Sequence, residues 1–235
     1  ILHPVYAGPH RQGLQDIADR RQPRVQVGRI RTAHDLCGLF FGKSVCGRLW
    51  HQHTGRRGCQ FAQPGLSRKI MTSEFGTPRT AIVTGGAKRI GAAFTRALAA
   101  DGWHVLIHCN RSRAEADALA AELGNASVVE ADLADAGCAS RIFAALAGLP
   151  PVGLLVNNAG HFVLDSLADF NPAGWAAHID ANARAAPLLT QRFAAALAKG
   201  QGGLIVNMLD AKLAFPDPDF FSYTMSKHAL SATVR

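Results

Sequence analysis

The chain has 235 residues, 48% of them hydrophobic, which is enough for one sizeable folded domain. It contains no apolar run long enough to span a membrane, and its first residues do not show the pattern of a signal peptide. The formal net charge is +8, but residues 1–70 hold 12 Lys and Arg against 3 Asp and Glu, a net +9. The remainder is almost neutral, so we expect neither a membrane protein nor a nucleic-acid-binding protein.

Residues 1–70 differ in composition from the rest of the chain. They are rich in Arg, Gln, Gly and His and show no sustained hydrophobic period. Met71 then opens the sequence "MTSEFGTPRTAIVTGG", which reads as a plausible translation start. We therefore expect 1–70 to be an unstructured basic extension or upstream sequence translated with the gene, and 71–235 to be the folded domain. A functional basic arm and a transit-like segment are the alternatives.

The cysteines indicate neither a metal site nor a disulfide framework. The cysteines and histidines of the first segment that could be read as a metal cluster are Cys37, Cys46, Cys59, His34, His51 and His53. Their spacings match no zinc-binding template, so we predict no metal. The 5 cysteines of the chain lack paired spacing, which favours a reducing, cytoplasmic location.

From Thr80 onward, short apolar runs alternate with helical patterns. In 90–102, for example, apolar residues recur every three or four positions and a glycine ends the pattern. The predicted strands are 80–85, 103–109, 126–133, 152–160 and 202–208, and the predicted helices are 90–102, 112–124, 136–148 and 177–200. Strands that are apolar on both faces and separated by helices indicate an α/β fold with a doubly wound parallel sheet.

The first strand and helix are joined by "TGGAKRIG", Thr84–Gly91. A glycine-rich turn at a helix N-terminus lets backbone N–H groups approach a pyrophosphate. Gly85 and Gly91 stand where the turn and the helix entry need no side chain, and Lys88 and Arg89 add positive charge. The pattern predicts a dinucleotide site, with a plain tight turn as the alternative.

The second strand ends in Asn110, Arg111 and Ser112. An acidic residue here would hydrogen-bond a ribose 2′-hydroxyl and favour NAD. Cations together with a hydroxyl suit a 2′-phosphate instead, so we expect NADP(H) as the cofactor. The alternative is that Arg111 only begins an exposed helix.

Five motifs in register carry a family resemblance. They are "TGGAKRIG", the "ADL" that contains Asp132, "NNAG" at 157–160, Asn182 in the long helix, and "YTMSK" with Tyr223 and Lys227. Segment 80–235 resembles the short-chain dehydrogenase/reductase family. The resemblance implies a Rossmann-type sheet that is C-terminally truncated, with the last two strands missing, so we expect a poorly soluble or inactive fragment.

The resemblance also implies the site residues. Those expected to bind the cofactor are Gly85, Lys88, Arg89, Ile90, Gly91, Asn110, Arg111, Ser112, Asp132, Leu133, Asn158, Ala159, Gly160, Tyr223 and Lys227. Tyr223, Lys227, Asn182 and Asp210 are expected to be catalytic, and Asn182 is expected to hold a water in the proton path. The family usually forms dimers or tetramers, so we expect a homo-oligomer.

The sequence is most similar to one branch, the pteridine reductases and their relatives that reduce dihydropterins or dihydrofolate. Arg89 stands where most of the family has glycine, and Phe162 stands where the branch stacks an aromatic ring on the pterin. Asp210 replaces the usual serine. The resemblance implies a substrate site of Arg89, Phe162, Asp210 and Tyr223. Two observations leave alternatives open: Gly160 is often serine in this branch, and Phe162 could be an ordinary core residue.

Asp210 suggests chemistry on a C=N bond. A serine can only hydrogen-bond a carbonyl oxygen, whereas a carboxyl can act with Tyr223 in supplying a proton to nitrogen. We expect Lys227, one helical turn after Tyr223, to lower the pKa of the phenol, and Asp210 to oppose that lowering. The alternative is that Asp210 only caps the end of a strand.

Three functions follow from these residues. The first is NADPH-dependent reduction of the C=N bond of a pterin or dihydrofolate. The second is NADPH-dependent carbonyl reduction of a ketone or 3-oxoacyl substrate, with Asp210 incidental. The third is a non-enzymatic protein that binds NADP(H) as a signal, against which Asn182, Tyr223 and Lys227 argue. In all three the expected ligands are small molecules.

Overall fold

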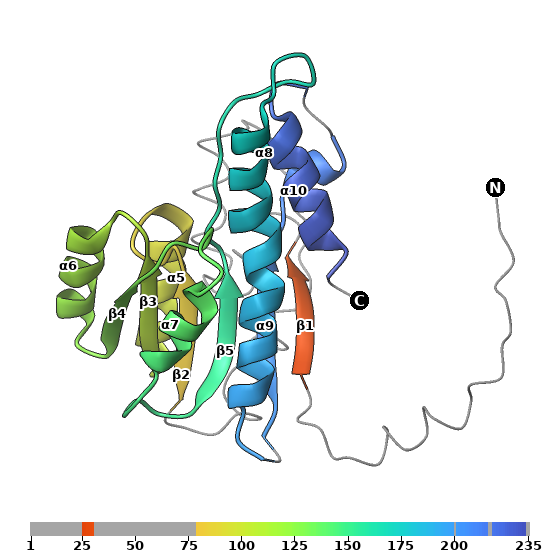
Figure 1. Ribbon diagram of the computed structural model, residues 1–235. Coiled ribbons are helices and arrows are strands. Elements are labelled where there is room, and N and C mark those ends of the chain that lie inside the picture. Colours follow the sequence, from red (N-terminus) through yellow and green to blue (C-terminus); the bar gives the residue numbers. More distant parts are fainter. Residues whose placement is uncertain (1–24, 31–78, 200, 216–217, 234–235) are drawn as a thin grey trace, which may run out of the picture.

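The computed structural model describes residues 25–30, 79–199, 201–215 and 218–233. Their strands form one six-stranded sheet in the order β1-β6-β5-β2-β3-β4, and every strand pairing is parallel (Figure 1). Parallel neighbours need crossover connections, which the helices supply. The α/β fold with a doubly wound, Rossmann-type sheet, predicted from the sequence, is confirmed.

The first half of the sheet is built from β2, β3 and β4. β2 spans Thr80–Thr84, β3 His104–Cys109 and β4 Ala126–Glu130, while α5 (Arg89–Ala100) and α6 (Arg113–Leu123) connect them. β2 is buried along its whole length. Its Ile, Val and Thr residues suit a strand that is covered on both faces.

The second half lies on the other side of β2. Its elements are α7 (Cys138–Ala144), β5 (Val152–Asn157), α8 (Pro172–His178), η1 (Ile179–Arg184), α9 (Ala185–Ala196), β6 (Gly203–Met208), η2 (Ala211–Leu213) and α10 (Phe221–Ser231). All five predicted strands are present.

α8, η1 and α9 form one long helix that begins earlier than the predicted residue 177. Its N-cap is Asn171, whose side chain accepts a hydrogen bond from the N–H of Gly174 at 2.9 Å, and Pro172 is the first helical residue. Its middle part, η1, is a π-helix. Pro187 follows shortly after and has no N–H to bond the carbonyl of Ala183, which is consistent with an irregular turn here.

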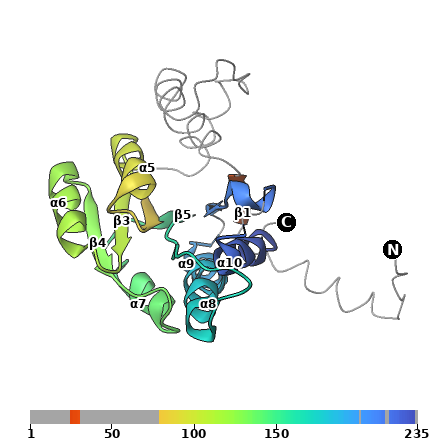
Figure 2. The same cartoon turned by 90° about the horizontal axis from the view of Figure 1, so that it is seen from above.

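Helices cover both faces of the sheet (Figure 2). On one face Phe94 and Leu98 of α5 pack into the core, and on the other Ile142 of α7 packs with Leu189 and Phe193 of α9. These side chains are all buried. Of the helices described, none is long and apolar enough to cross a membrane.

β1 was not predicted. It spans Val25–Ile30 and pairs in parallel with β6, from Val25 opposite Gly203 to Ile30 opposite Met208. These six residues differ from the expectation of an unstructured segment over 1–70. The other residues of that segment, including its cysteines and histidines, lie outside the described part of the chain.

Candidate active site

The sheet reverses its strand order between β2 and β5, and ligands of open α/β sheets bind at the carboxyl ends of strands at such a point. The glycine-rich turn follows β2, and the segment Asn158–Gly160 follows β5. The hydroxyl of Thr84 accepts hydrogen bonds from the N–H groups of Asn158 and Ala159 at 2.9 and 3.0 Å. The Asn158 amide donates in return to the carbonyls of Thr84 and Gly85. The two segments are therefore held together.

Two glycines of the turn are required by its geometry. Gly85 has a φ of +61°, and a Cβ at Gly91 would lie 2.0 Å from the carbonyl oxygen of Gly85. The first turn of α5 has no acidic residue, and its N-cap Lys88 makes no side-chain capping bond. Neither the N-cap nor the first turn therefore supplies a side chain that would compete with a phosphate for the N–H groups at this helix end, and the turn fits a dinucleotide.

Arg89 is strained. Its φ of 51° is the only positive value at a non-glycine residue in the part of the chain that the structure describes. The left-handed conformation costs an L-residue roughly 1–2 kcal/mol. Arg89 therefore stands at a position that costs backbone strain, a feature that clusters at functional sites.

We expect Arg89→Gly to stabilise the fold and weaken cofactor binding. Relief of the strain, less the backbone entropy of glycine, should raise the free energy of unfolding by about 1 kcal/mol. Loss of one charged hydrogen-bond donor should weaken NADPH binding about tenfold. Urea unfolding and fluorescence titration with NADPH measure the two effects. Arg89→Lys, which keeps both charge and strain, is the control; an unchanged unfolding free energy in Arg89→Gly would contradict the strain.

The predicted 2′-phosphate site lies between the glycine-rich turn and the start of α6. Arg111 is exposed, and Ser112 is the N-cap of α6 without a side-chain capping bond. Lys88 forms an ion pair with Glu115 of α6, at 2.5 Å. Arg111 and Ser112 thus remain suited to a phosphate, whereas the charge of Lys88 is shared with Glu115.

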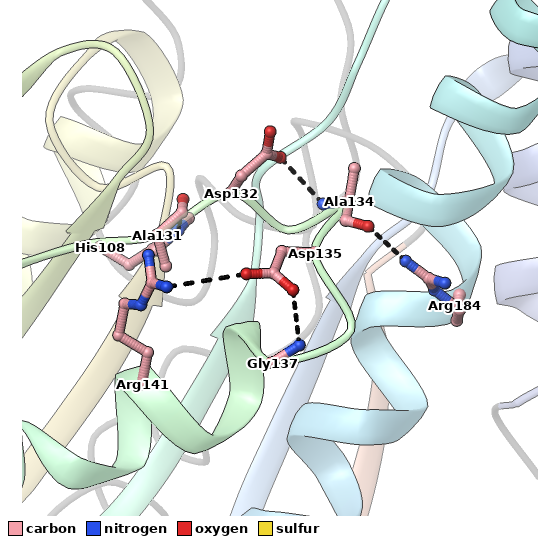
Figure 3. A network of polar contacts seen from close by, with 8 residues as sticks. All are labelled: His108, Ala131, Asp132, Ala134, Asp135, Gly137, Arg141 and Arg184. Carbon is pink, nitrogen blue, oxygen red and sulfur yellow. Dashed lines mark hydrogen bonds and ion pairs between the residues drawn. The ribbon is translucent and has the colours of Figure 1, made fainter.

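The loop after β4 carries Asp132 and is held by its own polar contacts (Figure 3). The Asp132 carboxylate accepts a hydrogen bond from the N–H of Ala134 at 2.9 Å, and Asp135 accepts from Gly137 at 2.8 Å. Arg184 of η1 donates to the carbonyl of Ala134. This loop is therefore tied to the long helix, two residues from Asn182.

Asp210 and Tyr223 form a direct pair. The Tyr223 hydroxyl donates to Oδ2 of Asp210 at 2.6 Å, while Oδ1 of Asp210 accepts from the N–H of Lys212 at 2.9 Å. Asp210 is thus both the N-cap of η2 and the partner of the phenol. Lys227, one turn further along α10, donates to the carbonyl of Met208 at 2.7 Å and lies 5.7 Å from the centre of the Tyr223 ring.

Burial dominates the electrostatics of this group. It raises the pKa of Tyr223, and the hydrogen bond to Asp210 and the charge of Asp210 raise it further. Burial also lowers the pKa of Lys227 to about 8, against a smaller upward effect of Asp210. The net direction for Tyr223 is opposite to the lowering expected from Lys227, so the phenol keeps its proton at neutral pH.

Asn182 joins the segment after β5 to α10. Its Oδ1 accepts from the N–H of His161 at 2.6 Å, and its Nδ2 donates to the carbonyl of His161 at 2.9 Å and to Oγ of Ser226 at 3.0 Å. Ser226 in turn donates to the carbonyl of Tyr223. Both amide hydrogens of Asn182 are used, which leaves one lone pair of its oxygen for a further partner.

Phe162 is not a core residue, since 54% of its surface is exposed. Its ring lies edge-on to Tyr223, with centroids 4.6 Å apart, and stacks on Phe220 at 4.5 Å with a 10° angle between the planes. Nζ of Lys212 lies 4.3 Å from the centre of the Phe220 ring. No third ring fits between two rings this close, so a planar ligand would use the other face of Phe162 or displace Phe220.

The predicted residues fall into two groups. Asp210, Tyr223, Lys227, Asn182 and Phe162 meet at the ends of β5 and β6, where a Cβ at Gly160 would lie 4.0 Å from Nζ of Lys227. The others lie around the glycine-rich turn and the ends of β3 and β4, with Ile90 46% exposed and Leu133 buried. Sequence reasoning missed four residues of the site: Thr84, His108, His178 and Phe220.

Of the missed residues, His178 had a signal in the sequence. It lies one helical turn before Asn182, is 1% exposed, and accepts a hydrogen bond from the N–H of Val163 through Nε2. Its ring centroid lies 6.4 Å from that of Tyr223. Among the described residues, no cluster of His, Cys, Asp and Glu could hold a metal ion.

The doubly wound parallel sheet, the glycine-rich turn and the Tyr223–Lys227 pair define the class of the protein as a dinucleotide-binding α/β protein. A family model described as short chain dehydrogenase matches residues 79–235. The chain therefore belongs to the short chain dehydrogenase family, and the resemblance inferred from its motifs is confirmed.

Three similar proteins bear on which branch of the family the chain resembles. Pteridine reductase 1 of Leishmania tarentolae is 33% identical over 68% of this chain and 70% of its own length. The 3-oxoacyl-[acyl-carrier-protein] reductase of Synechocystis sp. is 31% identical over 64% of this chain and 63% of its own length. The crystal structure of FolM alternative dihydrofolate reductase 1 from Brucella canis, complexed with NADP, superposes with a TM-score of 0.63 and 38% identity, over 66% of this chain and 65% of that one. The chain covers less than two thirds of the length of several relatives. Two other relatives, a short-chain type dehydrogenase/reductase of Picea abies and an uncharacterized oxidoreductase of Methylorubrum extorquens, are each covered over 63% of their own length.

Proposed function

We propose that the protein is an NADPH-dependent oxidoreductase that reduces a C=N bond of a pterin or dihydrofolate. The observation that carries the proposal is the 2.6 Å hydrogen bond between Tyr223 and Asp210, beside the exposed ring of Phe162. Similarity to a pteridine reductase and to a dihydrofolate reductase supports it.

In the proposed reaction, different residues bind the cofactor, bind the substrate and transfer the proton. The turn N–H groups and the N-terminus of α5 hold the pyrophosphate of NADPH, and Arg111 and Ser112 hold its 2′-phosphate. Bound NADPH supplies a hydride to the carbon of the C=N bond. Phe162 stacks on the heterocycle, and Tyr223 gives its proton to the nitrogen. Asp210, which is half-buried, returns a proton from solvent to Tyr223.

The test is NADPH consumption by the complete gene product with dihydrobiopterin, dihydromonapterin and dihydrofolate, beside a panel of ketones and 3-oxoacyl esters. We expect turnover of at least one of the three heterocycles and weak turnover of the ketones. Turnover of ketones alone would contradict the proposal and leave the second candidate.

That second candidate is an NADPH-dependent carbonyl reductase acting on a ketone or 3-oxoacyl substrate. Gly160, the generic family residue, favours it, as does the similarity to the 3-oxoacyl reductase. A carbonyl reductase would use the same Asn182, Tyr223 and Lys227. It would have no need of an aromatic ring at position 162.

Phe162→Ala distinguishes the two candidates. Aromatic pairs contribute roughly 0.5–1.5 kcal/mol beyond the area they bury, so we expect the KM for a dihydropterin to rise about tenfold. Phe170→Ala is the control, because Phe170 is also exposed but packs on Trp175 and Phe221 instead of Tyr223. Steady-state kinetics give both values; an equal change in the two variants would exclude a stacking role.

A further inference from the structure

His108 in β3 bridges two loops of the site. Its Nδ1 accepts a hydrogen bond from the N–H of Gly85 at 3.2 Å, and its Nε2 donates to the carbonyl of Ala131 at 2.9 Å. Figure 3 shows the His108 ring beside Ala131. The side chain is 1% exposed. A carbonyl can only accept and an N–H can only donate, so these partners require a neutral ring with its proton on Nε2.

The two partners belong to different parts of the nucleotide site. Gly85 opens the glycine-rich turn and has the left-handed φ of +61°. Ala131 opens the loop that carries Asp132. Burial lowers the pKa of His108, although its bond to Ala131 and the charge of Asp132 oppose this, so the ring stays neutral and Nδ1 stays an acceptor.

We propose that His108 is a positioning residue for NADP(H), whose neutral ring fixes the glycine-rich turn against the loop after β4 before the cofactor binds. The inference rests on the proposed use of this cofactor. A turn held in its binding geometry loses less conformational entropy when the pyrophosphate arrives. The main chain of β3 also reaches both connections, since the N–H of Gly86 donates to the carbonyl of His108 and the N–H of Ala131 to the carbonyl of Cys109. The His108 ring adds one side-chain bond to each connection, at the N–H of Gly85 and the carbonyl of Ala131.

Three substitutions separate the two hydrogen bonds. In His108→Asn the amide oxygen can reach the place of Nδ1 and keep the bond to Gly85. In His108→Gln the amide nitrogen can reach the place of Nε2 and keep the bond to Ala131. His108→Phe keeps the ring and loses both bonds.

The matched control is His104→Phe. His104 lies four residues earlier in the same strand and bonds Oγ of Ser127 on β4 at 2.8 Å, so its loss removes a histidine bond of β3 without touching the glycine-rich turn or the loop after β4. It stands at the amino end of β3, away from the glycine-rich turn. A purely structural effect of losing a histidine in β3 should therefore appear in both positions.

The readout is the dissociation constant of NADPH, measured by the change in its fluorescence without substrate, beside thermal unfolding of each variant. We expect the constant to rise about tenfold for each bond lost, so that His108→Phe binds more weakly than His108→Asn and His108→Gln. His104→Phe should bind within about twofold of wild type. At saturating NADPH, kcat of the His108 variants should be almost unchanged.

The outcomes are distinguishable. If wild type does not bind NADPH, the proposed function fails and this inference with it. If wild type binds, but His108→Phe binds equally well or weakens no more than His104→Phe, only the inference is overturned. It is also overturned if all three His108 variants fail to fold while His104→Phe folds, because His108 would then be required for the fold alone.

Discussion

Replacement of Asp210 by serine is expected to lower the turnover of a dihydropterin by roughly 10²–10⁴-fold, the usual contribution of general acid–base catalysis. Asp210 accepts a hydrogen bond from the Tyr223 hydroxyl at 2.6 Å. In the proposed mechanism, Asp210 returns a proton to Tyr223 after each turnover. A serine hydroxyl does not ionise at neutral pH, so it cannot take up a proton from solvent and then give it to Tyr223 as a carboxylate can. Turnover of a ketone should fall as well, because carbonyl reduction takes the same proton from Tyr223.

The same substitution should move the pH profile. The hydrogen bond to Asp210 and the charge of Asp210 both raise the pKa of Tyr223, in addition to burial. Without the carboxylate the pKa of Tyr223 falls, so the alkaline limb of kcat/KM should move to lower pH in Asp210→Ser. Rate profiles with a dihydropterin and with a ketone measure both effects on the same preparation.

Asp210→Asn separates the relay from the capping role. An asparagine oxygen can still accept from the N–H of Lys212 and keep η2 capped, but it carries no charge and relays no proton. We expect pterin turnover to fall as far in Asp210→Asn as in Asp210→Ser. Full pterin turnover in the asparagine variant would show that Asp210 acts as a cap alone.

Most of the fold could be predicted because the sheet is parallel and covered on both faces. Its strands are then continuous apolar runs, and the helices between them show their own period. The early start of α8 also had a signal, since Asn171 followed by Pro172 is a typical N-cap and first residue. β1 had almost no signal in the sequence, because the alternation of apolar and polar residues at Val25 and Val27 is short and lies in a basic segment.

Site residues could be predicted from the sequence where a reactive residue type stands at the end of a strand or the start of a helix. Asp210 follows a strand and Tyr223 begins a helix, so their types and places suggested the pair. His108 and Phe220 act through contacts that depend on which strands and loops are neighbours in space. The Gly85–His108–Ala131 bridge, for example, exists only because β2, β3 and β4 lie side by side with their carboxyl ends together.

Lys227→Met is expected to make the folded protein more stable at neutral pH and inactive. Burial lowers the pKa of Lys227 from 10.5 to about 8. Between these two values the unfolded chain binds more protons than the folded one, so stability rises with pH from about 8 to about 10.5. Below pH 8 the buried ammonium costs about 3 kcal/mol, at roughly 1.4 kcal/mol for each unit of pKa.

Methionine removes that charge and also the bond from Lys227 to the carbonyl of Met208, which contributes about 1 kcal/mol. The free energy of unfolding at pH 7 should therefore rise by about 2 kcal/mol in Lys227→Met, and the gain should shrink as the pH rises above 8. Urea unfolding at a series of pH values measures this. Lys199→Met, at an exposed lysine, is the control and should change stability by less than about 0.5 kcal/mol.

A gain in stability with a loss of turnover would identify Lys227 as a charge that the fold holds for function. Its ammonium lies 5.7 Å from the centre of the Tyr223 ring, one turn earlier in α10. In the part of the chain that the structure describes, no acidic side chain forms an ion pair with Lys227. A loss of stability at pH 7 would instead show that the bond to Met208 outweighs the burial of the charge. Lys227 would then be a structural residue of α10, and the proton path would rest on Asp210 and Tyr223 alone.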